Sequence, residues 1–203
     1  MDVVKLEEEI SKFIYELENE DRLVRVGLKD ISESSKVYKK HSHLFTKETL
    51  DQIKDKIQKT KNAKQKDILE RIYFMLVGSY IGLQLAPEAD KITTYFSKAT
   101  VKAGMDKIAY FEVAPRISKD PVFDRREQLD KASTAVVDKI NSKQLEILNS
   151  EVKLLKSLGF SGYLDFYSKA KKTDLSKFYK LAKETLKDTD RLWLYSIGKV
   201  AEA

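Results

Sequence analysis

The sequence predicts an all-α fold, an elongated bundle of long antiparallel helices with one small β-hairpin near residues 99–111. Proline and glycine, which interrupt regular structure, number only three and seven among the 203 residues. Charged residues make up 34% of the chain, above the roughly 25% of an average domain. Apolar residues recur at steps of three and four over long stretches, which is the spacing of one helix face.

We expect residues 1–203 to form a single helical domain, since a chain of this length buries roughly 70% of its unfolded surface on folding. The last helix is still amphipathic where the sequence stops at Ala203. This pattern favours an N-terminal fragment of a larger protein.

The first helix is expected to run from about Val4 to near Lys40. Gly27 lies inside this pattern and weakens it locally, because glycine in a helix interior costs about 1 kcal/mol relative to alanine. Its apolar face is predicted to comprise Leu6, Ile10, Phe13, Ile14 and Leu17, continued by Val24, Leu28 and Ile31.

A second helix is expected over Lys47–Lys61, with Thr46 as its N-cap. Phe45 and Leu50 then stand at the two positions of a hydrophobic staple, so Leu44 and Phe45 should turn inward. The third helix is predicted from Lys64 to Leu85, followed by a kink or a new turn at Pro87 and by further helix over 88–98. Its apolar run is interrupted by polar residues and is too short for a bilayer span, so no membrane segment is expected.

The C-terminal half predicts a second series of long helices. Asp120 and Pro121 favour a helix start with Asp120 as N-cap, and this helix should extend from Pro121 to Leu158, about 57 Å. Gly159 is expected to end it with a positive φ, and Ser161 to cap a short helix over 162–169. A last helix begins near Asp174. The inward face of the long helix is predicted to comprise Leu129, Ala132, Val136, Ile140, Leu145, Leu148, Val152 and Leu155.

The charge pattern argues against specific nucleic-acid binding. The net charge is +6, but only seven of the 38 basic residues are arginine, the usual residue for bidentate phosphate contacts. The lysine-rich stretch 54–66 carries no interleaved aromatic residue for base stacking, so a solvated face is the stronger interpretation. Cysteine is absent and the acidic N-terminus lacks a secretory core, which favours a cytoplasmic protein.

The two histidines, His41 and His43, are the first candidates for a metal site. Zinc needs three or four ligands, and residues two apart on a helix point in different directions, so helix-end and surface roles are favoured. Ser161 in the stretch GFSG is interpreted as part of a helix stop and start. No catalytic, cofactor-binding or metal residue is therefore assigned. The same structural interpretation covers Asp120, Asp124, Asp130 and Asp138 as a wet helix face, and the aromatic residues of 160–195 mostly as core packing.

Three stretches together resemble the N-terminal region of the thimet oligopeptidase and oligoendopeptidase F family of zinc metallopeptidases. They are YKKHSHLFTKETL (38–50), ATVKAGMDKIAYFEVAPRISKDPVFDRREQLDKA (99–132) and LLKSLGFSGYLDFYSKAKKTDL (154–175), and their succession spans most of the chain. The resemblance implies an almost wholly helical protein in which two halves enclose a channel for short peptides. It also implies zinc held by an HExxH helix and a later glutamate.

This sequence contains no HExxH, and neither histidine matches a zinc ligand, so no catalytic residue is carried over. The resemblance then implies one non-catalytic wall of the channel. Its partners would be the missing C-terminal catalytic domain and short peptides, with zinc only in the full-length protein. The alternative is a stand-alone helical module for protein–protein interaction, with a homo-oligomer formed through a helical face.

Overall fold

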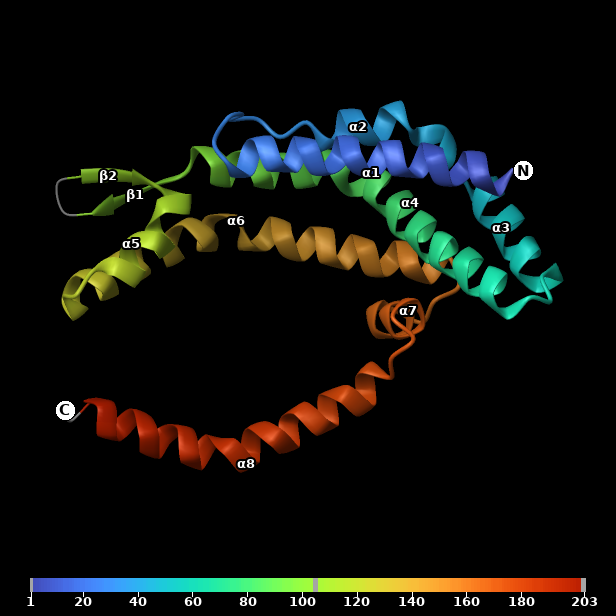
Figure 1. The fold of residues 1–203 in the computed structure, drawn as a ribbon. Coiled ribbons are helices and arrows are strands. Elements are labelled where there is room, and N and C mark those ends of the chain that lie inside the picture. Colours follow the sequence, from blue (N-terminus) through green and yellow to red (C-terminus); the bar gives the residue numbers. More distant parts are fainter. Residues whose placement is uncertain (1, 104–105, 202–203) are drawn as a thin grey trace. The chain divides into compact units, whose positions relative to one another are not determined.

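The structure is a computed structural model that describes residues 2–103 and 106–201, and it confirms an all-α fold with one small β-hairpin (Figure 1). Gly104, which lies between the two apolar runs behind the hairpin prediction, is outside the described residues. The chain divides into two compact units, residues 1–154 and 155–203. The α-helices are α1 (Val3–Arg25), α2 (Ser34–Lys40), α3 (Lys47–Lys59), α4 (Ala63–Lys98), α5 (Val113–Lys119), α6 (Phe123–Ser157), α7 (Tyr163–Ala170) and α8 (Leu175–Ala201).

The single first helix predicted over 4–40 is wrong, because the chain forms α1 and α2 with a break between them. Gly27 adopts φ +74°, a left-handed conformation that glycine accepts without steric cost, and the helix ends there. The amide groups of Leu28 and Lys29 both donate back to the Leu23 carbonyl. Leu28 and Ile31 are consequently exposed instead of continuing the apolar face.

Two buried carboxylates hold the segment between α1 and α2. Asp90 on α4 accepts hydrogen bonds from the Ser32 hydroxyl (2.8 Å) and from the Ser34 and Ser35 amides (both 2.9 Å). It thereby caps α2, whose own N-cap residue makes no capping bond. Glu20 on α1 accepts from the Lys29 ammonium at 2.7 Å. The apolar pattern could not reveal these bonds, because they link residues up to 58 positions apart or lie in loops.

The predicted start of α3 is confirmed. The Thr46 hydroxyl accepts from the Thr49 amide at 3.1 Å, and Phe45 and Leu50 are both buried as a hydrophobic staple requires.

Helix α4 continues through Pro87 to Lys98, and its start is capped by Asn62. Figure 1 shows α1 and α2 lying along α4, which also packs against α3. By length and composition α4 could cross a membrane, a test that the core helix of a protein also meets.

The far end of this unit has its own small core. Strands β1 (Thr100–Ala103) and β2 (Asp106–Ala109) pair antiparallel, with Val101 opposite Ile108, and both of these side chains are buried. The Tyr95 hydroxyl donates to the Val136 carbonyl at 3.0 Å and ties α4 to α6. The buried cluster comprises Val101, Ile108, Val113, Leu129 and Val136.

Asp120 does not cap a helix starting at Pro121 as predicted. Helix α5 was not predicted from the sequence, and Asp120 follows the end of that helix; its carboxylate accepts from the Val122 amide at 2.9 Å. Helix α6 therefore begins at Phe123, and its predicted inward face is interrupted, since Leu145 and Leu148 are about half exposed whereas Leu155 is buried. Pro115 is tolerated because it lies in the first turn of α5.

The second unit begins with the predicted helix stop. Gly159 has φ +89°, and the Phe160 amide donates to the Leu155 carbonyl at 3.1 Å, as in a Schellman motif. The residue directly before α7 is Gly162, so the predicted cap, Ser161, lies one position too early. The Ser161 amide donates a hydrogen bond to the Asp165 carboxylate. The Phe160 and Phe166 rings meet edge to face at 5.1 Å, and both are buried.

The loop before α2 makes part of the stability dependent on pH. Hydrogen bonds from Lys29 and then Lys36 lower the pKa of Glu33 from 4.5 to about 2. A lowered folded-state pKa contributes stability that is fully present above pH 4.5 and is lost as the pH falls towards 2. We expect urea unfolding to show this loss in the wild type and a smaller loss in Glu33→Gln. Parallel losses in the two proteins would contradict this assignment.

Candidate functional site

Each of the two histidines pairs with a glutamate of α1. The His41 Nε2 atom lies 3.1 Å from a Glu16 carboxylate oxygen, and the His43 Nε2 atom lies 3.0 Å from a Glu9 carboxylate oxygen. Both partners lie on α1, so each histidine joins the end of α2 or the following turn to α1. Within residues 2–103 and 106–201, no group of three or more metal-ligating side chains is placed to hold an ion.

The histidines differ in burial, which gives a matched pair of variants. His41 is buried and its ring meets Phe13 edge to face at 5.7 Å, whereas the His43 side chain is 64% exposed. We expect His41→Ala to lower the free energy of unfolding by about 1–2 kcal/mol and His43→Ala to change it by less than about 0.5 kcal/mol. Thermal unfolding with and without zinc tests whether the histidines bind metal. A melting temperature that zinc raises in the wild type, but not in one of the two variants, would contradict the structural role.

The other residues singled out in the sequence also have structural positions. The Ser161 amide bonds to Asp165, and hydrogen bonds from Lys169 and then Ser161 lower the pKa of Asp165. No histidine stands beside Ser161 in any described hydrogen bond, which fits a helix start. Asp124, Asp130 and Asp138 are exposed on α6. The structure therefore does not bring these residues together as a catalytic group.

The feature that stands out is an apolar face on α8 that the rest of the second unit leaves exposed. Seven side chains follow the helical period along one side of this 27-residue helix, and we call them the α8 stripe. Tyr179 and Trp193 are each 64% exposed, and Leu186 is 62% exposed. The stripe comprises Leu175, Phe178, Tyr179, Ala182, Leu186, Trp193 and Ile197.

The opposite side of α8 is strongly polar. Its charged residues include four lysines between 177 and 187 as well as Arg191, with Glu184 and Asp188 among them. The Lys199 ammonium lies 4.5 Å from the centroid of the Tyr195 ring, one turn earlier on the helix. A helix with one broad apolar side and one charged side is typical of a helix that packs against another surface.

Within the second unit, core packing does not account for the aromatic residues of α8, contrary to the expectation for most of those in 160–195. Phe160 and Phe166 are buried, but Phe178, Tyr179 and Trp193 are at least 60% exposed. The helical spacing in the sequence identifies an apolar face, but it does not say whether that face is covered. The sequence therefore pointed to the right residues and to the wrong environment.

Comparison of the chain with protein-family models, with curated proteins and with solved structures finds no match. The functional assignment accordingly depends on the residues and on their geometry. The α8 stripe is the candidate functional surface, because large exposed apolar patches mark sites of interaction.

Proposed function

We propose that this chain is a non-catalytic helical domain that forms one wall of the peptide channel of a zinc oligopeptidase. In this proposal the α8 stripe packs against the catalytic part, which carries the HExxH helix and the zinc. The observation that carries the proposal is the exposure of Phe178, Tyr179, Leu186 and Trp193 on one side of α8. Burial of one such side chain contributes about 1.5–3 kcal/mol, so several left exposed favour a docking partner.

Two further observations support this assignment. The order of the quoted stretches resembles the N-terminal region of the oligopeptidase family, and the described part is almost wholly helical with one hairpin between two long helices. The chain also offers no group of metal-ligating side chains among its described residues. The resemblance places zinc and the general base in the other part, so this domain would contribute enclosure and positioning of peptides.

A second candidate is a self-associating interaction module, favoured by the same stripe. Its residues repeat at the helical period over most of α8, which allows two copies of the helix to pack against each other. This candidate needs no catalytic partner. It predicts that the purified chain forms a dimer whose population rises with protein concentration.

The two candidates are separated by variants on the two sides of α8. Leu186→Asp with Trp193→Asp places charges in the stripe, whereas Lys180→Asp changes a charge on the polar side. We expect the stripe variant to weaken binding of the separately expressed HExxH part by more than about 100-fold, since central aromatic anchors are each worth about 2 kcal/mol or more. Lys180→Asp should retain binding within about threefold.

Isothermal titration calorimetry measures the binding, and analytical ultracentrifugation of the chain alone measures self-association. One outcome is that the wild type dimerises but does not bind the HExxH part, and that the stripe variant loses the dimer. This outcome would support the interaction module and overturn the oligopeptidase role. Equal effects of the stripe variant and Lys180→Asp would overturn both.

A further inference from the structure

A groove lies at the corner of the first unit where β1, α5 and the start of α6 meet. Its volume is about 800 Å³, within the range of pockets that hold ligands of drug size or short peptide segments. Four of its lining residues are cationic: Lys102, Arg116, Lys119 and Arg125. This groove and the α8 stripe belong to different units of the chain.

The groove has more positive charge than its own carboxylates neutralise. Arg116 pairs with Glu112 at 3.5 Å, and Arg125 pairs with Asp120 at 3.3 Å. Among the described side chains, Lys102 and Lys119 take part in no ion pair. Two positive charges are thus left for a ligand, and cations that line one concave surface attract anionic groups.

Apolar side chains stand beside these cations. Phe111, which is 49% exposed, lines the groove together with Pro115, Pro121 and Leu129. A free inorganic anion would leave this apolar surface in contact with water. A ligand with carboxylates beside apolar side chains would use both kinds of surface.

The corner that forms the groove is held in place before any ligand binds. The Asp120 carboxylate accepts from the Val122 amide at 2.9 Å, and its backbone carbonyl accepts from Arg126 Nη1 at 3.0 Å. The Arg126 guanidinium also lies 5.7 Å from the centroid of the Phe123 ring. Because these bonds fix the turn between α5 and α6, the cations need little rearrangement to meet a ligand.

We infer that this groove binds an acidic peptide segment whose carboxylates meet Lys102 and Lys119 and whose apolar side chains meet Phe111 and the prolines. A nucleic acid is disfavoured, since one exposed aromatic ring offers little base stacking and the two free cations are lysines. The inference goes beyond the proposed function. It rests on the groove alone and is tested on this chain without a catalytic part, so either proposal can fail while the other holds.

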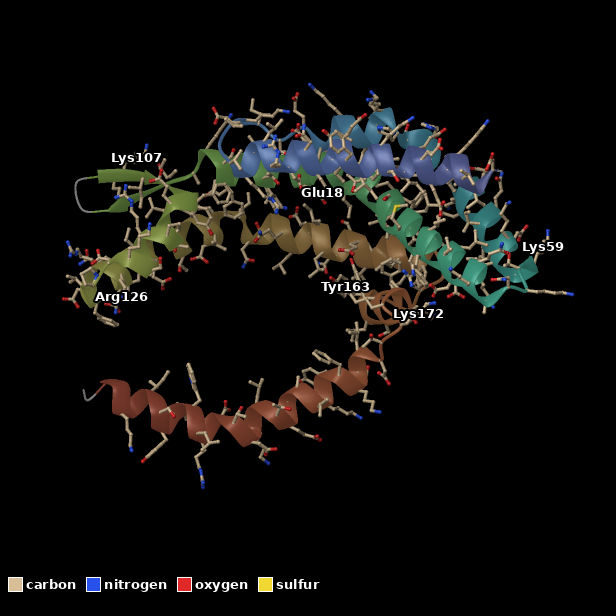
Figure 2. The ribbon with its side chains drawn as sticks, viewed as in Figure 1. Glu18, Lys59, Lys107, Arg126, Tyr163 and Lys172 are labelled. Atoms are coloured by element: carbon tan, nitrogen blue, oxygen red, sulfur yellow. The ribbon has the colours of Figure 1, made fainter. Side chains whose placement is uncertain are left out.

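The test uses a short fluorescent peptide of alternating glutamate and leucine, with a lysine–leucine peptide as the control ligand. Fluorescence anisotropy should show binding of the acidic peptide only. The double variant Lys102→Glu and Lys119→Glu should weaken that binding by at least about tenfold. The double variant Lys56→Glu and Lys59→Glu is the matched control, because it changes the net charge by the same amount. Both residues lie on α3, and Figure 2 shows Lys59 at the end of the first unit away from Lys107.

Weakening in the groove variant, with the Lys56→Glu and Lys59→Glu variant within about twofold of the wild type, supports the inference. Equal weakening in both variants would show attraction to net charge alone and overturn it. Absence of binding by the wild type, or displacement of the peptide by inorganic phosphate or by a single-stranded oligonucleotide at similar concentration, would also overturn it. Circular dichroism of each variant confirms that the helices remain folded.

Discussion

Replacement of Asp90 by alanine is expected to lower the free energy of unfolding by about 3 kcal/mol or more. The buried carboxylate accepts three hydrogen bonds from the segment that begins α2, and a hydrogen bond to a charged group is worth about 1.5–3 kcal/mol. Its loss leaves the Ser34 and Ser35 amides without their acceptor at a helix start. Urea unfolding followed by circular dichroism measures the change.

Two variants at or near this position sharpen the test. Asp90→Asn keeps one acceptor oxygen and should lose less stability than Asp90→Ala. Glu88→Ala removes an exposed carboxylate that pairs with Lys91 one turn along the helix, and we expect a change below about 0.5 kcal/mol. If Asp90→Ala were as mild as Glu88→Ala, the capping role of Asp90 would be wrong.

Gly82→Ala is expected to destabilise the protein by about 2 kcal/mol, although alanine is the better helix former. A Cβ atom at this position would lie 2.4 Å from the Tyr38 hydroxyl oxygen and 2.7 Å from its Cζ atom. The Tyr38 ring cannot yield freely, since it packs edge to face against both Phe13 and Phe45, with ring centroids 5.1 Å and 6.1 Å away.

Gly78→Ala is the matched control, one turn earlier on the same helix. No atom lies within 4 Å of a Cβ at Gly78, so this variant should gain up to about 1 kcal/mol from helix propensity. In a Tyr38→Ala background the cost of Gly82→Ala should disappear. A cost that persisted without the tyrosine ring would contradict the close packing of α2 on α4.

Local patterns predicted those parts of the fold that local chemistry determines. The cap at Thr46, the staple of Phe45 and Leu50, and the positive φ of Gly159 each depend on residues within a few positions, and each is confirmed. Gly27 was recognised as a weak point, but helical spacing on both sides concealed the complete break. The break is stabilised by Glu20 and Asp90, and the distance of Asp90 along the chain hides its role from the sequence.

The candidate site was only partly predictable for the same reason. Helical spacing identified the apolar side of α8, but exposure depends on what the rest of the molecule covers. The groove beside α5 was not predicted at all, because Lys102 and Lys119 come from separate elements that meet only in the folded chain. Counting charges along the sequence shows an excess of lysine. It does not show which lysines meet in one groove without a carboxylate partner among the described residues.

The central claim is that this chain is the non-catalytic wall of a zinc oligopeptidase. The most direct measurement is mass spectrometry of the native protein, captured from the cells that make it with an antibody raised against residues 1–154. The claim predicts that the captured material contains an HExxH sequence and zinc, and that it hydrolyses short peptides until a chelator is added. A captured protein of 23.4 kDa with neither an HExxH sequence nor peptide hydrolysis would contradict it.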